Sequence, residues 1–263
     1  MRILFLFLRI IIKKAQKALL RESQCFRRLL GCWIYDGASF ALLNYILNRY
    51  RSLAGWDANQ VIFLYAFHLF TYSVSAAFCR GLCASLRQNI ETGELDQAFL
   101  QPVSPLVYAA LQGIRVKHLS RTPVALFAMC YAYSQMNIAV SPISIVLLLI
   151  MLISALFAQS ALWIAASCFC FLWKGKNVFA ASIDVLSVFA RFPFGMYGPL
   201  PQMFLTFLLP LGFAGYFPAS VIVGATTDFV FSRFLPLATP MAGLLLLTGS
   251  IFLWRWLHKR YTA

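Results

Sequence analysis

Six apolar segments constrain the fold of this chain most, because each is close to the ~20 residues that a membrane-spanning helix needs. Apolar runs in the core of a soluble domain are usually shorter than this. The composition agrees with this interpretation. Of 263 residues, 61% are hydrophobic and only 11% are charged, which leaves too few polar side chains to cover a water-facing globule. We therefore expect an all-α integral membrane protein.

The apolar segments predict six transmembrane helices in a single transmembrane domain that covers residues 1–263. Between the fourth and fifth spans, the segment 178–197 contains both Asp184 and Arg191. These charges disfavour a full crossing, so we expect an interfacial or partly inserted helix there. The expected spans are residues 29–47, 58–79, 121–138, 143–173, 200–217 and 234–257.

The basic residues are distributed unevenly around these spans. The formal net charge is +14, and 19 of the 22 lysines and arginines fall on the cytoplasmic side if both termini lie inside. Lysine and arginine collect in cytoplasmic loops because they resist translocation. The distribution therefore predicts a multi-pass protein with both termini in the cytoplasm. No segment interleaves basic and aromatic residues as a single-strand binding groove does, so we expect no nucleic-acid partner.

The N-terminal segment 1–28 places its apolar residues before most of its basic residues. A cleavable signal peptide has the opposite order, with charge first and small residues last. The apolar part is also too short to span a bilayer. We expect an amphipathic interfacial helix whose lysines and arginines reach the phosphates of membrane lipids.

The sequence lacks motifs for bond-making chemistry. The pair Gly175-Lys176 is followed by Asn177, so the usual phosphate-binding loop is missing. The three histidines lie on separate segments, and the seven cysteines fall mostly within or beside apolar segments without the spacing of a zinc site. We expect no catalytic site, no metal and no cofactor on this chain.

Asp36, His68 and the pair Pro210 and Gly212 lie within three of the expected spans. The first contains Asp36 and the second contains His68, and such residues need a polar partner or water at that depth. Each serves either a structural role or a substrate path. Pro210 and Gly212 break the fifth span. Broken backbone is tolerated there only when it is buried in protein or lines a cavity, so both a kinked re-entrant helix and an external gate remain open.

An acidic segment, residues 85–105, separates the second and third spans on the cytoplasmic side. At helical spacing, Leu95, Ala98 and Phe99 form one apolar strip, and Pro102 and Pro105 are expected to stop the helix. A helix resting on lipid is one interpretation, but an anionic leaflet disfavours its acidic face. We favour docking to a protein partner. The acidic residues are Glu91, Glu94 and Asp96.

Two motifs resemble those of a known family. The run Gly93-Glu94-Leu95-Asp96, followed by Pro102-Val103-Ser104-Pro105, resembles the cytoplasmic loop of bacterial ABC type-2 transporter permeases. The resemblance is to the six-span branch that lacks its own ATPase domain. The stretch from Pro210 to Ala219 is similar to the one that closes the fifth span of that branch. Gln101 departs from the pattern, because the family often has arginine there.

The resemblance implies a permease subunit of an ABC exporter in the bacterial cytoplasmic (inner) membrane. Such a subunit forms half of a translocation pathway with a second permease chain, identical or related. Two separate ATPase subunits bind ATP and Mg²⁺. By analogy with the family, the transported molecule is lipophilic or amphiphilic.

The resemblance also implies roles for the matched residues. Glu91, Glu94 and Asp96 would make polar contacts on a coupling helix, and Leu95 and Phe99 would seat that helix in a groove of the ATPase. Gly93 would permit close backbone approach, and Pro102 and Pro105 would set the exit angle of the chain. A gate or substrate path would involve Pro210, Gly212, Tyr216, Phe217 and Pro218.

Two other functional classes remain as alternatives. A membrane-embedded enzyme acting on a lipid would need clustered Asp, His or metal ligands at one membrane face, and the sequence shows none. An ATP-independent channel or scaffold has no need of an acidic helix between the second and third spans.

Overall fold

The computed structural model describes residues 22–50, 52–94, 104–136, 138, 141–172, 178–225 and 234–261. These residues are almost entirely helical, which confirms the expected fold class. The segments 1–21 and 95–103 lie outside the described residues, and with them most of the expected N-terminal interfacial helix. Residues 22–28 belong to the first described helix, α2 (Glu22–Tyr50).

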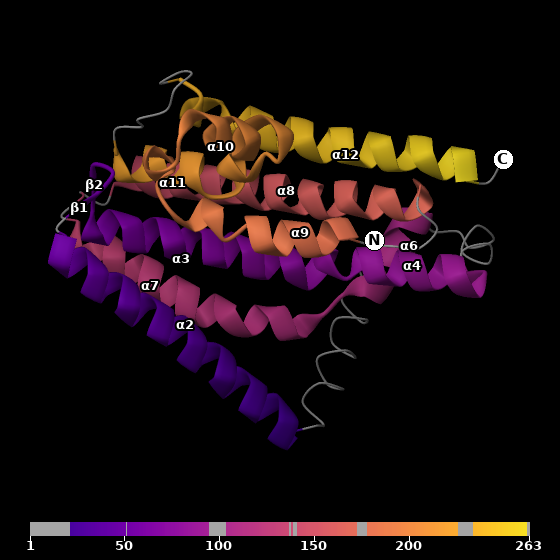
Figure 1. Ribbon diagram of the computed structural model, residues 1–263, viewed down its shortest axis with the longest axis horizontal. Coiled ribbons are helices and arrows are strands. Elements are labelled where there is room, and N and C mark those ends of the chain that lie inside the picture. Colours follow the sequence, from indigo (N-terminus) through magenta and orange to yellow (C-terminus); the bar gives the residue numbers. More distant parts are fainter. Residues whose placement is uncertain are drawn as a thin grey trace.

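The main helices run roughly along the long axis of the molecule (Figure 1). Helix α3 packs against α7 and α8, and α12 lies along α8. Figure 1 shows α2 inclined to this bundle and α9 beside α3 and α8. These elements are α3 (Ala58–Ser75), α7 (Thr122–Gln135), α8 (Pro142–Leu172), α9 (Val178–Leu186) and α12 (Thr239–Tyr261).

Three segments of the described chain are long and apolar enough to cross a membrane: Ala58–Thr92, Pro142–Leu172 and Leu235–Lys259. They correspond to the second, fourth and sixth expected spans. Helix α2 has 29 residues but does not qualify by composition, and α7 has only 14 residues. The structure thus supports a helical membrane protein, while the six-span topology stays a prediction.

A tight hairpin joins α2 to α3. Strands β1 (Ser52–Leu53) and β2 (Trp56–Asp57) pair antiparallel. The two residues between them, Ala54 and Gly55, have φ angles of +50° and +79°, and positive φ at both central positions is typical of the turn that suits a two-residue hairpin. The hairpin buries Trp56, whose ring lies 5.6 Å from that of Tyr216.

The connection between the second and third expected spans is more structured than its polar sequence indicates. It contains a π-helical turn η1 (Ala76–Arg80), α4 (Leu82–Thr92), α6 (Pro105–Gly113) and a 3₁₀ segment η2 (Val116–Arg121). Helices α4 and α6 pack against each other. They lie at the end of the molecule where α12 ends (Figure 1).

The segment between α8 and α12 is a series of short helical pieces. After α9 come two 3₁₀ turns, then α10, a second π-helical turn, another 3₁₀ turn and α11, so the expected break in the fifth span is present. The pieces are η3 (Phe189–Arg191), η4 (Phe194–Met196), α10 (Pro199–Met203), η5 (Phe204–Leu208), η6 (Leu211–Ala214) and α11 (Tyr216–Val223). A further 3₁₀ turn, η7 (Pro236–Ala238), precedes α12.

Small residues let α8 and α12 approach closely. A Cβ placed on Gly243 would lie 2.5 Å from the backbone oxygen of Ser154. The Ser154 hydroxyl donates a hydrogen bond to the carbonyl oxygen of Thr239 over 2.5 Å. Small side chains and hydroxyl hydrogen bonds are the usual means by which helices associate inside a membrane.

Candidate functional site

The described part of the acidic segment forms most of α4 and its end, in the hairpin that α4 makes with α6. Helix α4 ends at Gly93, whose φ of +74° places it in the left-handed region, where glycine carries no steric penalty. Glu91 pairs with Arg87 over 2.7 Å, and both side chains are about half exposed to solvent. Glu94 is described, whereas the predicted residues Leu95, Asp96, Phe99 and Pro102 lie outside the described residues.

Pro105 begins a helix in the structure. It is the first residue of α6, and the hydroxyl of Ser104 caps that helix by accepting a hydrogen bond from the backbone N–H of Val107 over 3.4 Å. Proline suits this position because the first N–H groups of a helix have no helical acceptor. Pro105 therefore fixes where the chain turns back into α6.

Two glycines fasten the base of the hairpin. A Cβ on Gly81 would lie 1.9 Å from the carbonyl oxygen of Gly113, and a Cβ on Gly113 would lie 2.6 Å from the carbonyl carbon of Gly81. The backbone N–H of Arg115 also donates to the carbonyl oxygen of Ala77 over 2.8 Å. Here the chain leaving α3 and the chain leaving α6 touch backbone to backbone, which only glycine permits.

The π-helical turn η1 carries a charged pair that the sequence did not indicate. The Nε of Arg80 at its end lies 3.1 Å from each carboxylate oxygen of Asp184 on α9, and Nη2 lies 2.5 Å from Oδ2. The hydroxyl of Tyr72 donates to Oδ1 of the same carboxylate over 2.5 Å. A π turn inserts one residue into a helix and is frequent at functional sites. These contacts join the end of α3 to α9, the first helix of the series of short helical pieces at residues 178–223, called the broken segment below.

The candidate gate residues gather around an aromatic cluster. Tyr216 stacks on Phe194 with ring centroids 4.4 Å apart, and Phe217 lies 5.9 Å from the same ring. A Cβ on Gly212 would lie 2.7 Å from the ring of Phe217. Gly212, Tyr216, Phe217 and Pro218 are buried, and Pro210 is partly buried. The backbone from Leu211 to Pro218 is therefore enclosed by protein, as irregular backbone at membrane depth requires.

His68 packs against this break. A Cβ on Gly215 would lie 2.7 Å from Nδ1 of His68 and 3.1 Å from the carbonyl oxygen of Ala190. One helical turn further along α3, the hydroxyl of Thr71 donates to the carbonyl oxygen of Ala214 over 3.0 Å. The polar side chains of His68 and Thr71 thus face the end of η6, where the Thr71 hydroxyl satisfies the carbonyl oxygen of Ala214.

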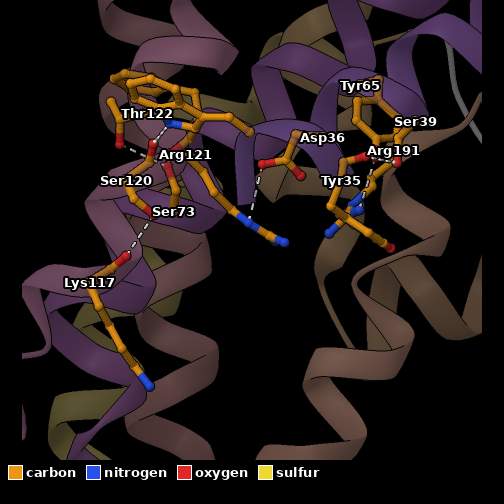
Figure 2. Close-up of polar contacts among 12 residues, drawn as sticks. Tyr35, Asp36, Ser39, Tyr65, Ser73, Lys117, Ser120, Arg121, Thr122 and Arg191 are labelled. Atoms are coloured by element: carbon orange, nitrogen blue, oxygen red, sulfur yellow. Dashed lines mark hydrogen bonds and ion pairs between the residues drawn. The ribbon is translucent and has the colours of Figure 1, made fainter. Parts of the chain in front are cut away.

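Asp36 on α2 has an ionic partner within the fold. Its carboxylate is fully buried, and Oδ2 lies 3.3 Å from Nε of Arg121. Figure 2 shows Arg121 on one side of Asp36 and Arg191 on the other. Arg191 is only 7% exposed; its guanidinium lies over the ring of Tyr65 and bonds the hydroxyl of that residue over 3.3 Å. Arg121 supplies the polar contact that we expected Asp36 to need.

A second contact ties α2 to the same place. The indole N–H of Trp33 donates to the carbonyl oxygen of Ser120 over 2.7 Å. Arg121 itself lies over the ring of Tyr35, with 5.5 Å between its guanidinium carbon and the ring centroid. Together these contacts hold α2 against the start of α7, which favours a structural role for Asp36.

Comparisons with known proteins fit this arrangement. Residues 33–263 match a family model described as "ABC-2 family transporter protein". No curated protein and no solved structure matched the chain. The family match covers every element described above except the first turns of α2. The chain belongs to the ABC-2 transporter family and is the membrane permease component of an ABC transporter.

Proposed function

We propose that this chain is half of the membrane pathway of an ABC exporter, driven by separate ATPase subunits that bind the tip of the α4–α6 hairpin. One observation carries this proposal: acidic residues at the end of α4 stand on a hairpin whose base is closed by the backbone contact between Gly81 and Gly113. A hairpin resting passively on lipid needs no backbone contact of this kind.

The tip offers a chemically suitable surface to a partner. Glu91 and Glu94 lie at the end of α4, next to a glycine around which nothing lies within 4 Å of an added Cβ. Leu95, Asp96, Phe99 and Pro102 follow at once in the sequence. Carboxylates beside apolar side chains suit a groove that has basic or helix-N-terminal groups at its rim.

Movement at the tip would reach the rest of the permease through two connections. The hydrogen bond from the backbone N–H of Arg115 to the carbonyl oxygen of Ala77 connects the end of the hairpin with η1, which directly follows α3. The Arg80–Asp184 pair connects η1 with α9. ATP and Mg²⁺ bound by the partner ATPase subunits would favour one arrangement of the two hairpins of a permease pair over another. The chain then responds by a shift between two states.

The proposed topology has six crossings, with both termini in the cytoplasm of a bacterial cell. Helices α2, α3, α7, α8 and α12 would supply five crossings, and the broken segment 178–223 would supply the remaining one. A second permease chain, identical or related, completes the pathway. Pro210, Gly212, Tyr216, Phe217 and Pro218 are proposed as gate residues, because they lie where the crossing is broken.

Charge reversal at the tip tests this function. In the double variant Glu94→Lys and Asp96→Lys, we expect membrane insertion to persist while the ATPase subunit no longer co-purifies and ATP-dependent transport stops. The control is Ser52→Lys, which adds a positive charge at an exposed position in the hairpin at the opposite end of α3. Normal transport by the double variant would refute the coupling role. Repeated purification of the wild-type chain without any ATPase would refute the exporter assignment itself.

A further inference from the structure

An apolar cavity of about 650 Å³ lies among α8, α9, η5 and α12, on one side of the broken segment. The residues that line it are hydrocarbon or aromatic, apart from the two hydroxyls of Ser182 and Ser250. The hydroxyl of Ser250 already donates to the carbonyl oxygen of Leu247 over 2.8 Å. The lining includes Ala165, Phe169, Ile183, Phe207, Leu246 and Gly249. Among the described residues, no charged side chain lines the cavity, so this lining offers nothing to orient an ionic group.

The cavity opens to one side, towards a surface that is itself apolar. Phe207, Leu208 and Leu245 line it and remain 59%, 70% and 66% exposed. Its walls include parts of α8 and α12, which belong to two of the three segments long and apolar enough to cross a membrane. At that depth the medium outside the opening is lipid hydrocarbon. If the cavity were empty, the side chains that line it would lose van der Waals contacts on that side, which costs dispersion energy.

The size of the cavity distinguishes between occupants. Ligand sites usually enclose about 300–1,000 Å³, and this cavity falls in that range. A helix about 10 Å across displaces roughly 120 Å³ per residue. The cavity would therefore hold only about five residues of a helix from a second copy. A flexible, unbranched hydrocarbon chain can follow an irregular apolar cavity without leaving polar groups unpaired.

We propose that this cavity is a binding site for one acyl chain of a membrane phospholipid. The head group stays outside the cavity, because the lining provides no partner for it. The bound chain contacts η5 and Pro210, the two elements at which the crossing breaks. The site goes beyond the coupling function, since it needs neither ATP nor an ATPase subunit.

Gly249 offers a way to fill the site. It lines the cavity, and nothing lies within 4 Å of a Cβ placed on it. Gly249→Leu therefore occupies the space without a clash at its first side-chain atom. Ala165→Leu fills the same cavity from α8 and serves if the first variant is poorly produced. Gly31→Leu is the matched control, because Gly31 lies on exposed α2 and its Cβ would also meet nothing within 4 Å.

The experiment uses the full chain in phospholipid vesicles with a trace of phosphatidylcholine that carries a photoactivatable diazirine at the end of one acyl chain. After illumination, labelled peptides are located by mass spectrometry. We expect labelling concentrated on residues 161–169, 179–186 and 245–253, a severalfold loss in Gly249→Leu and Ala165→Leu, and no change in Gly31→Leu. Labelling spread evenly over all exposed helices would overturn the proposal. So would labelling unchanged in both filled variants, or a second copy of this chain cross-linked across the opening.

The result is independent of the proposed function. Labelling is measured without nucleotide and without any ATPase, so an exporter that fails the lipid test remains an exporter. A chain that binds the acyl chain but never recruits an ATPase would refute the coupling proposal alone.

Discussion

Arg80 and Asp184, 104 positions apart in the chain, are joined by a bidentate ion pair to which Tyr72 adds a hydrogen bond. Their side chains are 33% and 25% exposed, so the pair is neither fully solvated nor fully buried. Arg80 ends a π-helical turn, and Asp184 lies on the first helix after α8. The pair is the strongest polar connection between the end of α3 and the broken segment in the described part of the chain.

Breaking this pair should destabilise the protein. We expect Asp184→Asn and Arg80→Gln each to cost about 1–3 kcal/mol of unfolding free energy, because the remaining group keeps a partly buried charge without its partner. The double variant should lose less than the sum of the two. The measurement is thermal unfolding of the purified protein in detergent. As control, Arg87→Gln should cost at most about 0.5 kcal/mol, since its pair with Glu91 is an exposed contact between neighbouring helical turns. Equal losses at both sites would contradict this ranking.

Alanine at the hairpin base should be far more harmful than alanine elsewhere. Gly81→Ala would bring a methyl group to 1.9 Å from the carbonyl oxygen of Gly113, so the two backbones must separate at a cost of at least about 2 kcal/mol. Gly37→Ala, with nothing within 4 Å of the added atom, should be neutral or stabilising by up to about 1 kcal/mol. Unfolding temperatures of the two variants provide the comparison. Similar unfolding temperatures for Gly81→Ala and Gly37→Ala would show that Gly81 and Gly113 are not in backbone contact.

The left-handed conformation of Gly93 predicts a graded effect of substitution. At a φ of +74°, valine should cost about 1–2 kcal/mol, whereas asparagine tolerates this region and should cost clearly less. The strain lies at the end of α4, so the effect should be local. Hydrogen exchange of residues 82–92 should therefore accelerate in Gly93→Val and change little in Gly93→Asn. Identical exchange in both variants would argue against the left-handed cap.

His118 should make stability depend on pH. Burial, with the nearby charges of Arg80, Lys117 and Arg115, lowers the pKa of His118 to about 4 in the folded protein, against 6.5 for a free imidazole. Between these values the unfolded chain binds a proton that the folded chain does not. The stabilisation is therefore present above pH 6.5 and is lost as the pH falls towards 4. The unfolding free energy of the wild type, measured relative to that of His118→Gln, should therefore fall as the pH is lowered from 7 to 4. A constant difference would show that His118 titrates normally.

The sequence predicted those parts of the fold that depend on local composition. The fourth span was expected at residues 143–173, and α8 spans Pro142–Leu172. The break near Pro210 and Gly212 was also expected, because proline removes a helical donor wherever it stands. Asp36 was expected to need a partner, since a buried carboxylate is costly on its own. Each of these inferences uses only a residue and its close neighbours.

Long-range pairings were not predictable in this way. Nothing near Arg80 indicates that its partner is Asp184, and nothing near Gly81 indicates that Gly113 crosses it. A helix was predicted within residues 85–105, but neither the end of α4 at Gly93 nor the packing of α6 against α4 was predicted. The partner of Asp36, Arg121, lies 85 positions along the chain and depends on how α2 is inclined.

The crossing of Gly81 and Gly113 has a mechanical consequence. With no side chains between the two backbones, there is no soft layer to absorb a small rotation at this point. Helix α4 extends 11 residues from the crossing, a length of about 16 Å. A tilt of roughly 10° about that pivot would swing the far end of α4 through about 3 Å. The hairpin therefore converts a small angle at its base into a displacement comparable to the length of a hydrogen bond.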